Sequence, residues 1–557
     1  MACAVLLLAQ TLSAATVGRY GVFERSFTAR SVSSNPYRDL AAEAVLVGLD
    51  GKATSPVPLF WDGGSTWKLR FSPNQTGLWK WTVRSADAGL NNQSGVFECV
   101  ASPLKGGLQP MVGAPHHFQR QNGERIWFLG DTAWALLSDN EPKLHHRAAV
   151  EQYLKNRAGQ GFTAVHLSLL SETAWGNAGG APWTDLAAEQ INPLYWQEAD
   201  QRIAFANAQG LTVGLTLAWA RKRTTAGELY AWGRFPSLEA RLRYARYIAA
   251  RYSAYNVYFL VSGEWHGEVG TRKSTQAAIR AEFVAIGDAL KAADPHGRMI
   301  GIHPMDDEGS TREFNDTAWM SFGDYQQNYS ALHQRVLDSR RFNKPVVNGE
   351  YAYFLRDRGG HGVVDKPHSY TVDDIRHATW DIVMGGAYVV TGFGSTYMGG
   401  NRHPTPFLPD DPKNEPWVEQ IGLVKTFFTS LDWWKLAPHD ELLLCPTPRS
   451  ADRSGLVEVN GRQQERVQAP ATTYWCLAEP GREYVIYTRG LKAPLTVELG
   501  EAPTRLQATQ FDPRSGQRTE LSPATVRHEF QFLPPDEQDW LLVLEQTRSP
   551  NHEPRHS

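Results

Sequence analysis

The sequence predicts an α/β protein in which a (β/α)8 barrel is flanked by an N-terminal and a C-terminal β-sandwich. Two observations indicate this fold class. Between residues 116 and 436, short apolar strands alternate with amphipathic helices, which is the pattern of a parallel sheet covered by helices. The segments on either side lack helical periodicity and consist of short strand patterns between turns. With 557 residues and 42% hydrophobic composition, the chain is long enough for two or three domains.

The N-terminal part, residues 16–102, has the pattern of a small β-sandwich. The segment Trp79–Val83 alternates at period two, as a half-buried antiparallel strand does, and Asp62-Gly63-Gly64 supplies a turn. Before it, residues 1–15 hold an apolar run and a small-residue exit, which predict a signal peptide without the usual basic start. We therefore expect a secreted or periplasmic protein, and a buried N-terminal strand is the alternative.

Eight apolar strands make up the predicted barrel. They are expected at residues 126–129, 163–169, 211–217, 256–262, 298–302, 319–322, 345–347 and 386–391. Helical patterns lie between them, and Thr371 with Asp374 predicts a capping box at the start of one. A hairpin around Asn122-Gly123 precedes the first strand. A doubly wound sheet would need a glycine-rich phosphate turn after that strand, and none is present there.

The last part, residues 437–547, again shows strand patterns. Tyr484–Tyr487, Leu495–Glu498 and Trp540–Leu544 are apolar strand segments, and turns such as Asp512–Gly516 lie among them. We predict a second β-sandwich here. The polar residues 548–557 are expected to be disordered.

Two of the predicted barrel strands end in a Gly-Glu pair. Glu264 follows the strand at 256–262, and Glu350 follows the strand at 345–347. Active sites of barrels lie at the carboxyl ends of the strands, so both carboxylates should face one pocket. Such a pair suits cleavage of a glycosidic bond, which needs a general acid and, in retaining enzymes, a nucleophile about 5 to 5.5 Å away. We predict Glu264 as acid/base and Glu350 as nucleophile.

Two alternatives to this assignment stay open. Each glutamate could instead pair with a neighbouring arginine or cap its strand. An inverting mechanism needs only a wider separation of the two carboxyl groups, about 6.5 to 9.5 Å.

Other polar and aromatic residues at the predicted strand ends could bind sugar hydroxyls or stack on sugar rings. Position alone points to them, since His166 could equally be a core histidine and Trp134 a packing residue. The predicted substrate-binding residues are Asp131, Trp134, His166, Trp219, Arg221, His266, His303, Asp324, Tyr325 and Tyr351.

Composition and motifs exclude several other functions. The formal net charge of −3 and the lack of long like-charge runs argue against a nucleic-acid partner. After the N-terminal run, no apolar stretch reaches the ~18 residues of a membrane span. The sequence has no HExxH, P-loop or G-x-S-x-G motif. A metal site from Glu264, His266, Glu268 and His303 is conceivable, but its spacing fits no known ligand pattern, so we expect neither metal nor cofactor.

The four cysteines give little further information. Cys3 lies in the predicted signal peptide and Cys99 stands alone in the N-terminal part. Cys445 and Cys476 could pair in an oxidising compartment, but their spacing does not establish it. Oligomeric state is not indicated by any pattern.

Six segments of the predicted barrel together resemble one known family. They are Trp127-Phe-Leu-Gly-Asp-Thr-Ala-Trp134, Tyr153-Leu-Lys-Asn-Arg-Ala-Gly-Gln-Gly-Phe162, Gly210-Leu-Thr-Val-Gly-Leu215, Arg251-Tyr-Ser-Ala-Tyr-Asn256, His303-Pro304 and Lys344-Pro-Val-Val-Asn-Gly-Glu350. They resemble the apiosidase-like glycoside hydrolases, which are secreted bacterial barrel enzymes. The segments before and after are similar to the sandwich that often precedes this barrel and to a C-terminal domain that carries a collagen-binding label.

The resemblance implies that Glu350 is the nucleophile. It differs at the acid/base, because the characterised members have Gly-Gly-Asp where this chain has Ser262-Gly263-Glu264. Those members act on apiose in plant pectin side chains, and the difference leaves the sugar of this chain open.

We therefore expect a secreted retaining glycoside hydrolase that acts on a plant or microbial polysaccharide. The main alternative is a non-catalytic protein that binds carbohydrate or matrix, with the barrel as a scaffold. A metal-dependent hydrolase is the third possibility.

Overall fold

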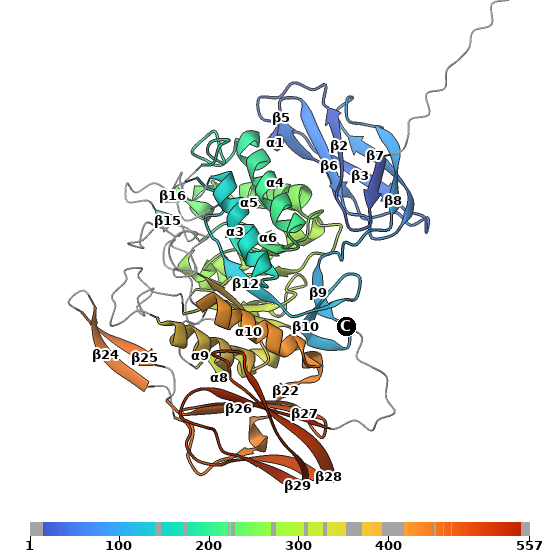
Figure 1. The fold of residues 1–557 in the computed structure, drawn as a ribbon. Coiled ribbons are helices and arrows are strands. Elements are labelled where there is room, and N and C mark those ends of the chain that lie inside the picture. The colour runs from blue at the N-terminus through green and yellow to red at the C-terminus, as the bar shows by residue number, and fades with distance from the viewer. Residues whose placement is uncertain are drawn as a thin grey trace, which may run out of the picture.

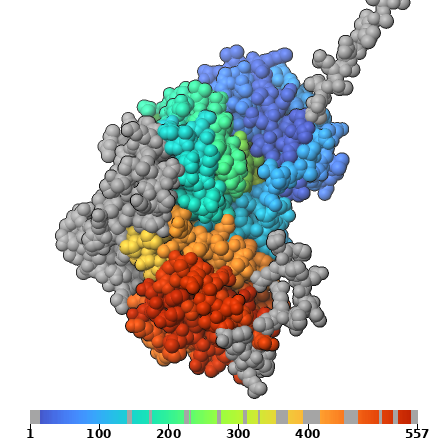
Figure 2. Space-filling view, in the orientation of Figure 1, coloured from blue at the N-terminus to red at the C-terminus, as the bar shows by residue number. Residues whose placement is uncertain are grey.

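The structure, a computed structural model, has an elongated shape in three parts. It describes residues 15–139, 146–170, 176–220, 222–223, 229–268, 275–305, 310–326, 331–352, 370–392, 417–450, 453–459, 462–468 and 471–546. The N-terminal and C-terminal β-rich parts lie at opposite ends, and the barrel lies between them (Figures 1 and 2). Among the helices of these described ranges, none is long and apolar enough to cross a membrane.

The central part is a nearly closed barrel of eight parallel strands. In chain order they are β12 (Leu129–Thr132), β13 (Ala164–Ser168), β14 (Thr212–Thr216), β17 (Val257–Leu260), β18 (Ile300–Gly301), β19 (Gly323–Gln326), β20 (Val346–Glu350) and β21 (Tyr388–Gly392). They pair in the order β18-β17-β14-β13-β12-β21-β20-β19. The two ends of this sheet meet where Ile300 forms a parallel bridge with Met320 and accepts a 2.8 Å hydrogen bond from the amide of Ser321. The predicted barrel is confirmed.

Helices cover the outside of the barrel. They are α3 (Arg147–Gly159), α4 (Pro193–Ala208), α5 (Leu238–Tyr252), α6 (Gln276–Ala292), the short α7 (Ser310–Phe314), α8 (Leu332–Arg340), α9 (Val372–Val383) and α10 (Trp417–Thr429). The predicted capping box is present at α9, where Thr371 and Asp374 each accept a hydrogen bond from the other's backbone amide. Thr275 caps α6 and Ser237 caps α5 in the simpler way, by accepting from an amide of the first turn.

Two barrel strands begin later than their apolar runs suggest. The first was expected at 126–129, but Ile126 pairs with Phe118 in the hairpin of β10 (Ala114–Arg120) and β11 (Arg125–Ile126), below the barrel. The sixth was expected at 319–322, but Trp319 packs against Gly287 of α6. As a consequence, Asp131 and Asp324 lie within strands rather than after them.

The N-terminal part is a sandwich of two sheets around an aromatic core. One sheet holds β1 (Ala15–Gly18), β8 (Ser94–Val100), β7 (Gly77–Ser85), β3 (Ala42–Val47) and β4 (Val57–Pro58), and the other holds β2 (Phe23–Thr28), β6 (Thr66–Phe71) and β5 (Phe60–Gly63). Phe23 of one sheet stacks on Phe97 of the other, with ring centroids 4.0 Å apart. The remaining small elements are α1 (Pro36–Asp39), β9 (Leu108–Met111), β15 (Lys222–Arg223) and β16 (Leu229–Tyr230).

Buried charges join the N-terminal sandwich to the barrel. Arg70 of β6 lies 2.6 Å from Asp200 of α4, and Asp200 also pairs with Arg251 of α5 at 2.7 Å. Arg251 in turn lies 2.9 Å from Asp62 of β5. Because these side chains are almost fully buried, removal of one partner would leave a charge without compensation. The sandwich is therefore part of the barrel's support.

The C-terminal part is an antiparallel sheet that encloses its own core. Its strands are β22 (Ala437–Pro438), β26 (Thr473–Glu479), β27 (Glu483–Arg489), β30 (Trp540–Gln546), β28 (Leu495–Phe511), β23 (Leu443–Leu444) and β29 (Arg518–Phe532), with a separate hairpin of β24 (Arg453–Val459) and β25 (Arg462–Gln468). The pairing of the long β28 shifts register at bulges near Gly500, so its two halves pair with β23 and with β30.

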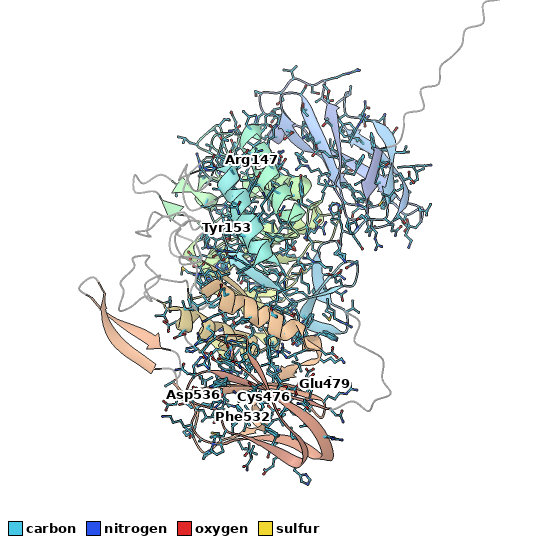
Figure 3. All side chains as sticks on the ribbon, viewed as in Figure 1. Arg147, Tyr153, Cys476, Glu479, Phe532 and Asp536 are labelled. Carbon is cyan, nitrogen blue, oxygen red and sulfur yellow. The ribbon has the colours of Figure 1, made fainter. Side chains whose placement is uncertain are left out.

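The core of this C-terminal part contains Cys476 and Phe532, both labelled in Figure 3. Cys476 and Cys445 are both free cysteines. A buried pair of Arg376 on α9 with Asp539 just before β30, at 2.7 Å, ties this part to the barrel.

Candidate active site

The barrel's seventh strand, β20, positions Glu350 at its carboxyl end. Val346 and Val347 anchor the strand in the barrel wall, each with 1% of its surface exposed. The side chain of Asn348 accepts a 3.2 Å hydrogen bond from the amide of Glu350. Glu350 is itself only 3% exposed. Its carboxylate is therefore held by a rigid, buried strand end.

The fourth strand, β17, places Glu264 in a different backbone setting. Glu264 has a φ of 46°, in the left-handed region that costs an L-residue roughly 1 to 2 kcal/mol. The neighbouring Gly263 is hydrogen-bonded on both sides, donating to Ala218 O at 3.0 Å and accepting from Ala220 N at 2.8 Å. Glu264 is half-buried, directly before the short 3-10 helix η2 (Trp265–Glu268). The strained turn sets the direction of the Glu264 side chain, which is partly open to solvent.

Gly263 also explains why glycine precedes Glu264. A β-carbon at this position would lie 2.5 Å from the ring of Trp219. That distance is shorter than any real contact, so a side chain would displace the indole ring. Glycine therefore lets Trp219 lie against the strand end that carries Glu264.

His303 contacts the strand ends that carry the two candidate glutamates. It follows β18, and its amide donates to Ser262 O at 2.9 Å, which joins it to the segment that leads to Glu264. Its Nε2 atom lies 3.5 Å from Oε2 of Glu350. Glu264 and Glu350 are thus linked to the same histidine, one through the backbone and one through the side chain.

The other nitrogen of His303 faces a third carboxylate. Nδ1 lies 3.0 Å from Oδ2 of Asp324, the second residue of β19. Burial alone would lower the pKa of His303, but the charge and hydrogen bond of Asp324, with a smaller contribution from Glu350, raise that pKa to about 10. His303 is therefore an imidazolium at neutral pH. Burial raises the pKa of Asp324, and His303 opposes that change.

Two indole rings pack beside His303. The ring centroids of Trp134 and Trp219 are 5.1 Å apart, and they lie 5.6 Å and 5.8 Å from that of His303. Both indole rings are almost fully buried, with 3% and 2% of their surface exposed, so their stacking on a sugar ring stays a prediction. The structure thus brings together six of the predicted site residues, and these are Trp134, Trp219, Glu264, His303, Asp324 and Glu350.

His166 lies deeper, inside the barrel. It is fully buried, with ring centroids 5.7 Å from Trp134 and 5.4 Å from Tyr258. Gly214 makes this possible, because a β-carbon there would lie 2.5 Å from both His166 and Tyr258. Burial, with a smaller contribution from the positive His303, lowers the pKa of His166 to about 3. His166 is therefore neutral and supports the layer beneath the carboxylates.

Other predicted residues contact the helices. Asp131 of β12, 1% exposed, forms an ion pair with Arg157 and accepts a 2.7 Å hydrogen bond from Tyr153, both on α3 (Tyr153 is labelled in Figure 3). Tyr351 bonds Thr379 of α9 at 2.7 Å. Tyr325 is buried in β19. The assignment of these residues as substrate contacts stays a prediction.

His266 lies at the more open side of the site. It is half-buried, and its ring centroid is 3.8 Å from that of Trp265. Burial lowers the pKa of His266 to about 4, so it is neutral at neutral pH. Arg221, the last predicted substrate-binding residue, lies outside the described residues.

The site contains residues that the sequence pattern did not assign. Asn348 bonds the amide of Glu350, and Gly349 leaves the space that Asp324 occupies. An asparagine inside an apolar strand was the available signal for the first. Glu268, considered above as a metal ligand, instead pairs with Arg241 of α5 at 3.3 Å. Within the described ranges, no group of three or more His, Cys, Asp or Glu side chains is arranged to hold a metal.

Comparison with known families identifies the class. Residues 114–435 match the model described as "Apiosidase-like, catalytic domain", which covers more than half of the chain. The chain therefore belongs to the apiosidase-like family and carries its catalytic domain, so it is a hydrolase of glycosidic bonds. Residues 16–86 match a domain of unknown function, DUF5060. None of the curated proteins matches the chain.

Solved structures share the fold. A protein from Bacteroides vulgatus ATCC 8482, provisionally described as a glycoside hydrolase, aligns with a TM-score of 0.70 at 16% identity, over 96% of this chain and all (100%) of that chain. A second structure, named "Glycoside hydrolase", gives 0.61 at 18% identity, over 80% and 97%. A glycoside hydrolase family 5 protein from the same Bacteroides strain gives 0.60 at 18% identity, over 79% and 94%. At these identities the likeness concerns the fold.

Proposed function

We propose that this protein is a retaining glycoside hydrolase in which Glu350 is the nucleophile and Glu264 the general acid/base. The observation that carries the proposal is His303, a buried cation whose side chain meets Glu350 and whose backbone joins the segment before Glu264. A nucleophilic carboxylate must be ionised, and an adjacent imidazolium favours that state. The partial exposure of Glu264 suits a group that exchanges protons with solvent.

In the first step, one carboxyl oxygen of Glu350 attacks the anomeric carbon. The bond from that carbon to the leaving oxygen breaks, and Glu264 gives its proton to this oxygen. The product is a glycosyl ester on Glu350 with Glu264 ionised. His303 stays protonated throughout and offsets the buried charge.

In the second step, water replaces the leaving group. Glu264 takes a proton from the water while its oxygen attacks the anomeric carbon, and the ester bond to Glu350 breaks. The sugar leaves with its original anomeric configuration, and both carboxyl groups return to their starting states. This cycle needs no cofactor.

We further propose that the substrate is a plant or microbial polysaccharide and that the protein acts outside the cytoplasm. Support comes from the indole rings of Trp134 and Trp219 beside His303 and from the small-residue exit of the N-terminal apolar run. The name of the family points to apiose as the sugar. At the acid/base position, however, this chain has Glu264 where the characterised members have aspartate. Glu264 is one methylene longer, so the sugar can differ.

The C-terminal part could add a binding function to this hydrolase. The resemblance implies collagen binding, and we propose a role in holding a polymer near the barrel. The buried Arg376–Asp539 pair supports this role, because it couples the two parts mechanically. Co-sedimentation of the full chain with fibrillar collagen and with insoluble polysaccharides tests the proposal. Binding to neither polymer would contradict it.

The main experiment is an activity screen of wild type, Glu350→Gln and Glu264→Gln on aryl glycosides and polysaccharides. We expect cleavage by wild type, none by Glu350→Gln, and a leaving-group-dependent loss in Glu264→Gln. If wild type cleaves nothing yet all three proteins bind a polysaccharide equally, the non-catalytic alternative replaces this proposal.

A further inference from the structure

Three side chains from consecutive strands form a continuous buried line. Asp324 of β19 meets His303 at 3.0 Å, and His303 meets Glu350 of β20 at 3.5 Å. The exposed fractions of the three side chains are 0%, 0% and 4%. Water therefore screens these charges very little, and each strongly affects its neighbour.

The protonation state of His303 follows from this geometry. Both of its ring nitrogens face carboxylate oxygens, which only accept hydrogen bonds when ionised. A neutral imidazole has one N–H and can serve one of the two carboxylates, whereas an imidazolium can serve both. The raised pKa of His303, about 10, agrees with the charged form.

Gly349 leaves room for the side chain of Asp324. A β-carbon on Gly349 would lie 2.3 Å from Oδ1 of Asp324, so the carboxylate rests against the bare backbone of β20. Gly349 directly precedes Glu350. The residue that admits Asp324 is thus part of the strand end that carries the nucleophile.

We propose that Asp324 is a positioning residue, which holds His303 charged and oriented so that His303 keeps Glu350 ionised and aimed at the substrate. The inference rests on the proposed nucleophilic role of Glu350 and adds a device that sets the working pH range of the site. Asp324 itself touches neither substrate nor reacting atoms in this scheme.

Among the residues that the structure describes, the other side chains packed around His303 are uncharged. Trp134 and Trp219 pack against its ring, Ser262 and Trp265 meet its backbone, and the pKa of nearby His166 is lowered to about 3. Within the described ranges, the charges that face the imidazolium from the packed strands are therefore those of Asp324 and Glu350.

The consequence for pH dependence has a definite sign. With Asp324 in place, His303 stays charged up to about pH 10, so it is charged wherever Glu350 is needed as an anion. With a neutral residue at 324, burial would dominate and His303 would lose its proton at lower pH. Glu350 would then lack a cationic partner and take up a proton more readily. The acid limb of kcat/KM should move to higher pH.

The test is the pH profile of kcat/KM for Asp324→Asn on an activated aryl glycoside. An opposite charge at this distance shifts a carboxyl titration by about 1 to 3 units, so we expect the acid limb to rise by at least about one pH unit. An unshifted limb with a uniform loss of activity would reduce Asp324 to a structural residue and overturn the proposal.

A second pair of variants probes the same contact from the other side. Gly349→Ala should displace Asp324 and shift the acid limb in the same direction. Gly159→Ala, at the end of α3, places its β-carbon where nothing lies within 4 Å and is the matched control. An unshifted acid limb in Gly349→Ala would contradict the proposal.

A spectroscopic measurement on wild type covers the case in which the Asp324 and Gly349 variants fail to fold. Nitrogen-15 histidine spectra, with His303 assigned by its loss in His303→Gln, should show both ring nitrogens protonated at pH 8. A neutral His303 at pH 8 would overturn the proposal. Failure of the proposed function would look different, because Glu350→Gln would then keep its activity whatever the state of His303.

Discussion

The two strand ends that carry Glu350 and Glu264 differ in backbone conformation and in burial. Glu350 ends β20, where the pairing with β19 shifts register by one residue; it is 3% exposed and adjoins a buried imidazolium. Glu264 has a left-handed backbone and is half-buried. The contrast matches two chemical tasks, since a nucleophile must stay ionised and fixed, whereas an acid/base must gain and lose a proton in every cycle.

The largest expected loss of activity is that of a substitution at the buried Glu350. Glu350→Gln keeps the shape of the side chain but removes its charge and nucleophilicity. We expect kcat to fall by about 10⁴-fold or more, the scale seen when a covalent nucleophile is removed. Steady-state rates on an activated aryl glycoside measure this. A fall of less than tenfold would show that the buried carboxylate does not attack.

Substitution of the half-buried Glu264 should lower the rate by an amount that depends on the leaving group of the substrate. In Glu264→Gln, a poor leaving group loses the general acid, which contributes about 10²- to 10⁴-fold. The first step for a dinitrophenyl glycoside needs no proton and should be nearly unchanged. The test is the ratio of the rate on a glycoside with a poor leaving group to the rate on the dinitrophenyl glycoside of the same sugar. Equal losses on both substrates would contradict the assignment of Glu264 as acid.

Backbone strain at Glu264 gives a smaller, independent effect. Glycine adopts a positive φ freely, so Glu264→Gly should be more stable than Glu264→Ala by about 1 kcal/mol. At Glu151, inside α3, the order should reverse by a similar amount, because glycine is a poor helix residue. Thermal unfolding of the four variants measures both differences. If Glu264→Ala is at least as stable as Glu264→Gly, Glu264 is not strained.

The smallest expected effect is that of a metal chelator. Nδ1 of His303 lies 3.0 Å from Asp324 and Nε2 lies 3.5 Å from Glu350, and Glu268 pairs with Arg241, so neither group is arranged as a metal ligand. Activity after dialysis against EDTA should stay within the error of the untreated enzyme. Loss of activity that zinc or calcium restores would favour the metal-dependent alternative.

Much of the fold could be predicted because buried strands and helices carry strong periodicity. The apolar runs before Glu264 and Glu350 placed both residues at strand ends. The exceptions have a physical cause. Ile126 and Trp319 are apolar because they pack below and outside the barrel, so the strands begin after them and Asp131 and Asp324 move into the wall.

The contacts within the site could not be predicted in the same way. Three different strands or strand ends carry His303, Asp324 and Glu350. The periodicity of one strand does not show which side chains of the neighbouring strands its own side chains will contact. Asp131 meets Arg157 on the following helix for the same reason. Glycines were the overlooked signal, because Gly263 and Gly349 each mark a place where a side chain from another strand approaches the backbone.

The most direct test of the account is to trap the intermediate. Wild type and Glu264→Gln are treated with an activated 2-fluoro glycoside of the sugar found in the screen, digested and examined by mass spectrometry. The account predicts one added glycosyl mass on the peptide that contains Glu350. A label on another carboxylate, or rapid release of product with inverted configuration and no label, would contradict it.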